Sequence, residues 1–333
     1  MTYPYAAGAA DHQELEWLGG GTMRILLDGD RTGGKFSMFR SSAPAGAASP
    51  AHVHTREDEI FVLLSGSAVY WVGDRRFEAG PGSVAFLPRG VPHAYRITSD
   101  ADLLAMSTPS GLEGFFRGAG HDLSTPKPPG WTVTPETMGK AAADNGQIIL
   151  GPPLDLDGTL PADGYPKSGG YVAQSDEHET LEWLGGGLMR ILLNEQHTDG
   201  QLSLFRSSAP EGSASPVYVH HKEDETIVML SGSGIYWVGE DRHELSAGGV
   251  VVVPRGVAVA HRITSDAETL AVTTPGGLES FFRMAGHDVS QPRPDGWQTS
   301  YELMSQAARA TGQSILATPL EADEKIPEAV LGR

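Results

Sequence analysis

The sequence predicts an all-β protein built from two tandem barrels with short helices near the C-terminal end of each. Three observations support this prediction: a long internal repeat, many short segments rich in β-branched and aromatic residues, and abundant turn residues. The 333 residues include 42 glycines and 23 prolines, which favour turns between short strands over long helices. The chain is 39% apolar and 20% charged, an ordinary composition for a globular protein.

The repeat has an offset of 166 residues. The segment Leu15–Leu27 returns almost unchanged as Leu181–Leu193, and the match continues without a gap until Leu154, which pairs with Leu320. Solenoid repeats are about 20–50 residues long, so a repeat of this length indicates duplication of a whole domain. We therefore expect an N-terminal domain at 1–154, a linker rich in Gly, Pro and Asp at 155–168, and a C-terminal domain at 169–333.

Within the first repeat, short β-type segments are bounded by Gly, Pro, Asp or Ser, a pattern typical of a sandwich or barrel. A hairpin turn is expected at Val72–Arg75. A helix is expected at 135–144, with Thr134 as its N-cap and Pro135 in its first turn, and its repeat at 301–310. The predicted strands are 35–40, 59–64, 68–72, 83–87, 93–97 and 103–106.

Charge and composition exclude several partners and sites. The formal net charge is −18, which disfavours nucleic acid and anionic membranes as partners. The chain has no cysteine, so any metal must be held by His, Asp or Glu. The first residues lack the features of a signal peptide and no apolar run could span a bilayer, so we expect a cytoplasmic protein. Either a monomer or a homodimer is compatible with the duplication.

One cluster of residues carries metal-binding chemistry. It contains His52, His54 and Glu59 between Gly46 and Gly66, followed by a second block with Gly82, Pro88-Arg-Gly90 and His93. These spacings resemble the two sequence motifs of the cupin superfamily, whose fold is a double-stranded β-helix, or jelly-roll barrel. The resemblance implies that His52, His54, Glu59 and His93 are metal ligands. One departure is Ile97, which stands where the second motif often has an asparagine that is not a ligand.

The spacing has an independent physical reason. Residues two apart on a strand point to the same face, so His52 and His54 share a direction. The odd step to Glu59 requires a turn or bulge at 55–58 to aim it at the same point. Three imidazoles and one carboxylate suit a divalent transition metal, namely Fe, Mn, Ni, Co or Zn. We expect one such metal per chain.

The second repeat lacks this ligand set. By the offset of 166, its counterparts are Tyr218, His220, Glu225 and Val259, so two of the four ligands are missing. We expect a metal-free second barrel that serves structure, packing or substrate enclosure. An alternative is a displaced site that also uses His261, but a shift of two residues along a strand is about 6.6 Å, too far for a coordination bond of about 2 Å.

A further stretch, Ser107–Arg117, recurs as Thr273–Arg283 and is similar to a segment that follows the second motif in quercetinase-type cupins. Those enzymes cleave a flavonol heterocycle with O₂ and release carbon monoxide. The resemblance implies a metal-dependent dioxygenase for a flavonol-like or other enolic or phenolic molecule, with Glu59 as the general base. The segment is also expected to form a short helix that packs Leu112, Phe115 and Phe116 on the outside of the barrel.

Two other classes of function stay open at this stage. A redox-neutral cyclase, isomerase or decarboxylase would use the same four ligands with the metal as a Lewis acid. A ligand-binding protein without catalysis is the other alternative, and the complete ligand set argues against it. Residues expected on the inner wall of the barrel, mainly as core packing, are Phe36, Met38, Phe61, Tyr70, Tyr95 and Met106.

Overall fold

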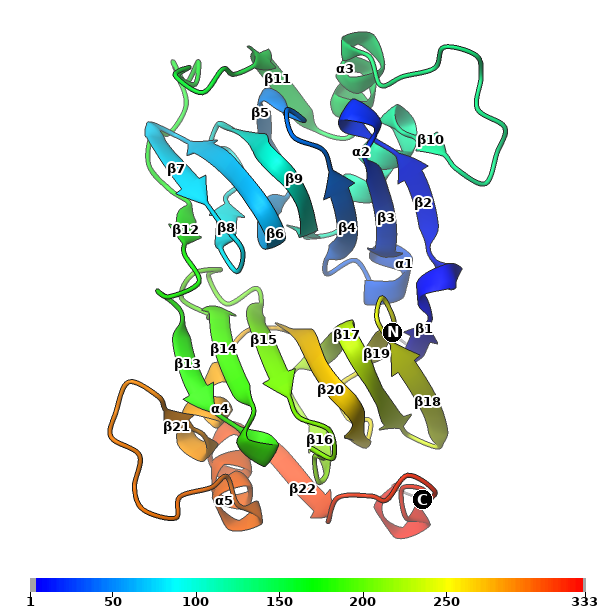
Figure 1. The fold of residues 1–333 in the computed structure, drawn as a ribbon, viewed down its shortest axis with the longest axis vertical. Helices are drawn as coiled ribbons and strands as arrows, with labels where there is room; N and C mark the ends of the chain where they lie inside the picture. Colours follow the sequence, from blue (N-terminus) through cyan, green and yellow to red (C-terminus); the bar gives the residue numbers. More distant parts are fainter. Residues whose placement is uncertain (1–3, 332–333) are drawn as a thin grey trace. The chain divides into compact units, whose positions relative to one another are not determined.

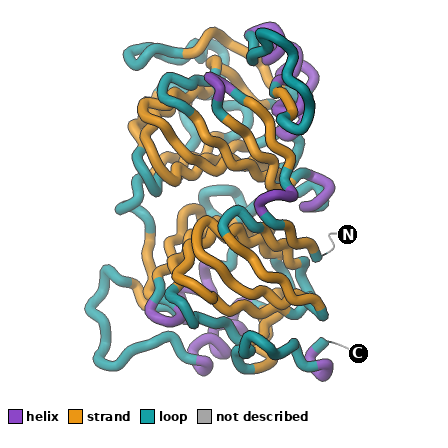
Figure 2. The backbone as a smooth tube through the Cα atoms, turned by 45° about the vertical axis from the view of Figure 1, so that its right-hand side comes forward, coloured by secondary structure: helices purple, strands orange, loops and turns teal. Residues whose placement is uncertain are grey.

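The computed structural model describes residues 4–331, in which strands outweigh helices (Figures 1 and 2). Two compact units are present. One contains His12–Glu177, and the other contains His178–Arg333 together with the residues up to Asp11. Each unit has one eleven-stranded sheet with short helices, so the predicted all-β class is confirmed. The outermost residues of the expected domains, 1–3 and 332–333, lie outside the described part of the chain.

The elements of the first unit follow the order of its sequence. They are β2 (Gln13–Glu16), β3 (Thr22–Leu27), α1 (Gly29–Thr32), β4 (Ser37–Ala43), β5 (Pro50–His54), β6 (Asp58–Val72), β7 (Arg75–Ala79), β8 (Val84–Leu87), β9 (His93–Thr108), α2 (Leu112–Ala119), β10 (His121–Asp122), α3 (Pro135–Asp144), β11 (Gln147–Pro153) and β12 (Tyr171–Ala173).

The second unit repeats this order from β13 onward, except that turns stand between β14 and β15 in place of α1. It contains β1 (Tyr5–Ala7), β13 (Glu179–Glu182), β14 (Leu188–Leu193), β15 (Ser203–Ala209), β16 (Val217–His220), β17 (Asp224–Val238), β18 (Asp241–Ser246), β19 (Val250–Val253), β20 (Val259–Thr274), α4 (Glu279–Ala285), β21 (His287–Asp288), α5 (Tyr301–Thr311) and β22 (Gln313–Ala317).

The prediction of separate strands was wrong at two places. The segments 59–64 and 68–72 form one strand, β6, and the segments 93–97 and 103–106 form one strand, β9. These two long strands pair with each other, and their register shifts between Leu63 and Ala68. Such β-bulges bend a strand without ending it. The polar residues at the bulge resemble the end of a strand in the sequence, so two strands were predicted where there is one.

The first strand of each repeat pairs outside its own half of the sequence. Strand β1 pairs with β19, and β12, its counterpart in the repeat, pairs with β8. The contacts therefore group the chain differently from the boundaries at 154 and 168, which remain a prediction about the duplicated sequence unit. Tyr5-Ala-Ala7 and Tyr171-Val-Ala173 carry the repeat into these strands.

The helix predictions were confirmed. Helix α3 spans Pro135–Asp144, the Thr134 side chain accepts a hydrogen bond from the Thr137 backbone amide, and the helix buries Met138, Ala141 and Ala142. The expected hairpin is also present, since β6 ends at Val72 and β7 begins at Arg75. No helix within residues 4–331 combines the length and apolar character needed to cross a membrane.

The motif glycine Gly66 lies in the bend between the two halves of β6. It has a φ of 80°, and an added Cβ would overlap with the Asp100 carbonyl oxygen and lie 2.7 Å from the Ala101 Cα. Gly46 has a similar φ of 89°, but nothing lies within 4 Å of an added Cβ. Of these two glycines, only Gly66 is required for both its backbone conformation and a close approach of two backbones.

We expect Gly66→Ala to lower the free energy of unfolding of the metal-free protein by about 3 kcal/mol, because overpacking adds to the left-handed strain. Gly46→Ala is the matched control. It should lower the free energy of unfolding by only about 1 kcal/mol, because it adds left-handed backbone strain without overpacking. Chemical denaturation of both variants measures the difference. Equal losses for the two variants would contradict the close-approach argument.

Candidate metal centre

The two histidines of the first motif lie on β5 and point into the barrel. Strand β5 pairs with β9, where His52 is directly opposite His93, and with β11 on its other side. The Nε2 atoms of His52 and His54 are 3.2 Å apart, and both side chains are buried. The shared direction expected from their spacing of two is therefore present.

Glu59 reaches the same point from β6. The chain turns between the end of β5 at His54 and the start of β6 at Asp58, as the odd spacing predicts. The Oε2 atom of Glu59 is 3.6 Å from His54 Nε2 and 3.4 Å from His93 Nε2. One ligand atom from each of the four residues lies within 4.8 Å of the others, and this is the only such group of His, Asp or Glu in the described part of the chain.

The contacts of these atoms fit a divalent transition metal. Ligands at about 2.1 Å from a metal lie about 3.0–3.4 Å from their neighbours in octahedral or tetrahedral geometry, close to the distances observed. The Nδ1 atoms of His52 and His93 each lie 2.9 Å from a backbone carbonyl, of Pro50 and Val91. Donation from these Nδ1 atoms leaves the Nε2 lone pairs for a metal.

Two atoms at the centre of the group lack other partners. Glu59 Oε2 and His93 Nε2 are buried and make no hydrogen bond with any described residue. Buried polar atoms are normally satisfied, so a shared cation explains their convergence. The residues present therefore fit a bound divalent metal.

The pKa values of His52 and His54 shift in opposite directions. Burial, together with the neighbouring His93 and His54, lowers the pKa of His52 well below its usual value, which keeps this ring in the neutral form that binds metals. Burial would also lower the pKa of His54, but the carboxylates of Glu57 and Glu59 outweigh it and raise the pKa to about 9. A metal must therefore displace a proton from His54.

Burial would raise the pKa of Glu59, but His54 and His93 outweigh that effect and lower it below the usual range. The carboxylate is consequently ionised throughout the physiological range of pH. Burial raises the pKa of the Tyr95 phenol, so this neighbour stays neutral. The centre thus offers one anionic oxygen and three imidazoles to a ligand.

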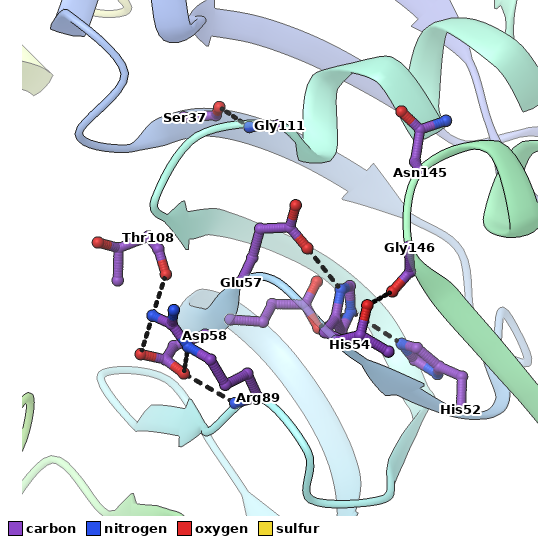
Figure 3. A network of polar contacts seen from close by, with 12 residues as sticks. Ser37, His52, His54, Glu57, Asp58, Arg89, Thr108, Gly111, Asn145 and Gly146 are labelled. Carbon is purple, nitrogen blue, oxygen red and sulfur yellow. Dashed lines mark hydrogen bonds and ion pairs between the residues drawn. The ribbon is translucent and has the colours of Figure 1, made fainter.

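Behind His54 lies a second carboxylate that the sequence analysis did not single out. Glu59 faces the Nε2 atom of the His54 ring. Glu57 is 3% exposed, and its Oε2 atom is 3.7 Å from the Nδ1 atom of the same ring (Figure 3). A carboxylate in this place orients a ligating histidine and increases its basicity. The spacing of three residues from His54 was its only signal in the sequence.

An ion pair holds the two motifs together. The backbone amide and Nε of Arg89 donate to Asp58 Oδ1, its Nη2 donates to Asp58 Oδ2, and the same Nη2 donates to the Thr108 carbonyl (Figure 3). Asp58 precedes Glu59, and Arg89 lies in the turn that leads to His93. The pair therefore fixes the start of β6 relative to the turn before β9.

A small cavity of about 40 Å³ adjoins the centre and is lined by His52, His54 and Glu59. Of the expected inner-wall residues, Phe61 and Tyr95 line it, whereas Phe36, Met38, Tyr70 and Met106 are buried in the core. The placement of Phe115 and Phe116 on the outside of the barrel was wrong. Helix α2 turns both rings into the core, where they contact Trp17 edge-to-face and line the cavity.

The second barrel keeps the scaffold but not the ligand group. Tyr218 donates a hydrogen bond of 2.8 Å to Glu225 Oε2, and His220 Nε2 is 3.4 Å from the same oxygen. Val259 stands where His93 lies in the first barrel, and His261 stacks against Tyr236. No second metal-binding group forms among residues 4–331, so the displaced site with His261 is not assembled.

Comparison with known proteins agrees with this architecture. The cupin domain model matches residues 39–109 and again residues 205–274, and the first match contains all four converging residues. The chain carries two cupin domains. The expected bicupin fold is thereby confirmed, with the second domain matching at the positions that the repeat predicts.

Quercetin 2,3-dioxygenase of Bacillus subtilis (strain 168) is 27% identical to this bicupin over 274 residues, which cover 79% of this chain and 80% of the relative. Solved structures with this fold include two oxalate decarboxylases. Lactobacillus farciminis oxalate decarboxylase, in a formate complex, has a TM-score of 0.57 at 16% identity, covering 83% of this chain and 88% of that one. Bacillus subtilis oxalate decarboxylase, described with Mn(II) centres, has a TM-score of 0.56 at 17% identity, covering 83% and 78%.

We expect Arg89→Gln to loosen the start of β6, because the buried Asp58 carboxylate loses its charged partner at a local cost of about 1–3 kcal/mol. Hydrogen exchange of residues 58–63, followed by mass spectrometry, should become faster. Arg255→Gln is the matched control, since Arg255 makes the equivalent contacts with Asp224, and should affect 224–229 only. Unchanged exchange in Arg89→Gln would contradict the role of the ion pair.

Proposed function

We propose that this bicupin is a metal-dependent enzyme whose first barrel holds one divalent transition metal through His52, His54, Glu59 and His93. The proposed reaction is the O₂-dependent cleavage of a flavonol-like or other enolic or phenolic molecule. The observation that carries the proposal is the convergence of four buried ligand atoms, two of them otherwise unpartnered, beside a cavity with apolar walls. The similarity to a quercetin 2,3-dioxygenase supports the reaction class.

The residues of the first barrel have distinct roles in this proposal. When bound, the metal supplies Lewis acidity and, if it is redox-active, a route for electrons to O₂. Glu59 accepts the proton of the substrate hydroxyl, so the O–H bond breaks and the electron pair stays on the substrate oxygen. His54 and His93 keep the carboxylate ionised, so it can accept a proton, and the same two contacts lower its strength as a base.

The apolar wall determines what reaches the centre. Trp17, Phe61 and Phe115 line the cavity with large side chains, which exclude water from a reactive anion. The phenol of Tyr95 stays neutral and offers a hydrogen-bond donor beside the substrate. These features suit an aromatic or enolic molecule more than a multiply charged one.

The size of the cavity favours a second candidate. A cavity of about 150 Å³ binds benzene, whereas the space beside the ligands is about 40 Å³. A three-ring flavonol would require the walls formed by α2 and α3 to move apart. A redox-neutral cyclase, isomerase or decarboxylase with a smaller substrate would use the same ligands without that movement.

Elemental analysis of the purified protein tests the metal site. We expect about one transition metal per chain, as for a single site with four protein ligands. His54→Ala should lose the metal, because it removes a central ligand. His220→Ala, the matched change in the second barrel, should keep it. If His54→Ala retained the metal and His220→Ala lost it, the metal site would lie in the second barrel, which would contradict the proposal.

Oxygen uptake tests the reaction. With quercetin as substrate, the metal-loaded protein should consume O₂ and release carbon monoxide, and anaerobic conditions should stop turnover. Glu59→Gln should lower kcat by about 10²–10⁴-fold, the contribution of a general base. Since Glu59 is also a proposed ligand, metal content must be measured in the same sample. Turnover that continues unchanged without O₂ would exclude the dioxygenase reaction and favour the redox-neutral one.

A further inference from the structure

The second barrel contains the larger cavity of the two. Its volume is about 100 Å³, against about 40 Å³ in the first barrel. The wall is mainly apolar, with Met189, Ile227, Ile263 and Phe281 among its residues. Leu184 and Ile315 also line it and are partly exposed, so the cavity reaches the surface of its unit.

Substitutions at matched positions open this space. Phe61 and Leu103 line the first cavity, and their counterparts at the offset of 166 are the smaller Ile227 and Thr269. A barrel that had lost its metal and served packing alone would gain stability by filling its interior. This barrel has instead kept an open interior and added polar groups to it.

Three polar side chains on the cavity wall are buried, and each has a polar atom without a hydrogen bond in the described chain. His220 is 5% exposed, Ser213 is 6% exposed and Gln313 is 6% exposed. The hydroxyl of Ser213 and the Nε2 atom of Gln313 make no hydrogen bond to any residue of the described chain, and His220 Nε2 has a contact of 3.4 Å with Glu225 Oε2 but no hydrogen bond. Ser213 replaces Ala47 of the first barrel, so its hydroxyl is an addition. Buried groups of this kind require a partner inside the cavity.

The charge of Glu225, on the cavity wall beside His220, limits which molecules can bind in the cavity. Glu225 Oε2 accepts the Tyr218 hydroxyl at 2.8 Å. Burial would raise the pKa of Glu225, but the neighbouring His220 and Tyr218 outweigh it and lower the pKa, so the carboxylate is ionised. It repels an anion and accepts hydrogen bonds from a neutral hydroxyl.

We propose that the second barrel is a metal-free binding site for a neutral phenol-type molecule of one ring. The apolar wall around Ile227 and Phe281 holds the ring, and the polar end at His220 and Glu225 binds the hydroxyl. The cavity of about 100 Å³ is smaller than the about 150 Å³ that binds benzene, so it admits no more than one ring, and that ring must extend toward the opening beside Leu184 and Ile315. This site is independent of the reaction proposed for the first barrel.

Fluorine NMR of the full chain with 4-fluorophenol tests the proposal. The His54→Ala variant is the background, because it removes a proposed ligand of the first barrel. We expect one probe molecule to bind per chain in this background. Fluorobenzene, which lacks the hydroxyl, and 4-fluorobenzoate, which is an anion, should each bind about tenfold more weakly or worse, the expected loss for a hydrogen bond to a charged group.

Cavity-filling variants locate the site. Ile227→Phe and Thr269→Leu restore the residues that the first barrel holds at these positions, and each should weaken 4-fluorophenol binding by about tenfold or more through steric exclusion. Leu103→Phe narrows the first cavity instead and should leave the affinity unchanged. Thermal unfolding checks that each variant is folded. Two cavity-filling variants are used so that the test still stands if one of them does not fold.

Three results would overturn the proposal. Binding that is absent in the His54→Ala background but present in the metal-loaded protein would place the probe in the first barrel. Equal affinity for fluorobenzene and 4-fluorophenol would show an apolar void without recognition of the hydroxyl. No saturable binding of 4-fluorophenol at all would show that the cavity holds only water.

Discussion

The pairing of β9 with both β5 and β6 is the constraint on which the candidate metal centre depends. In this register His93 lies opposite His52 on one side and Val72 on the other, while Glu59 pairs with Ser107 farther along the same strand. A slip of one residue would turn His93 away from the interior, because successive side chains on a strand face opposite sides. The ion pair of Arg89 with Asp58 and the close approach at Gly66 both act on this register.

The two barrels show how one backbone supports two kinds of interior. Asp224 and Arg255 repeat the ion pair, and β17 pairs with β20 in the same register as β6 with β9. The difference lies in side chains that face inward, where Val259 and Tyr218 replace two histidines. The hydrogen-bonded strands and the ion pair maintain the scaffold through such exchanges, because one cross-strand pair of side chains contributes only about 0.2–1 kcal/mol.

The sequence predicted the fold through its repeat and its strand-like segments, and it predicted the four converging residues through their resemblance to the two cupin motifs. The spacing of His52 and His54, the turn before Glu59 and the capped helix at Pro135 can be read from neighbouring residues. Other features depend on contacts between residues far apart in the chain. Phe115 and Phe116 were placed on the wrong side of the barrel because the pattern of a helix does not say which surface it covers. The continuity of β6 and β9 was missed because polar residues in the sequence can mark either a β-bulge within one strand or the end of that strand.

The pairing of β1 with β19 and of β12 with β8 has a consequence for how the chain can be divided. Each sheet is completed by a strand from the other half of the duplicated sequence, so a fragment cut at the repeat boundary would expose the backbone of an inner strand. Exposed edges of this kind promote association. Two separately produced halves would therefore complete their sheets only by exchanging β1 and β12 between the two fragments. Covalent linkage of the halves makes this strand exchange intramolecular, with a high effective concentration.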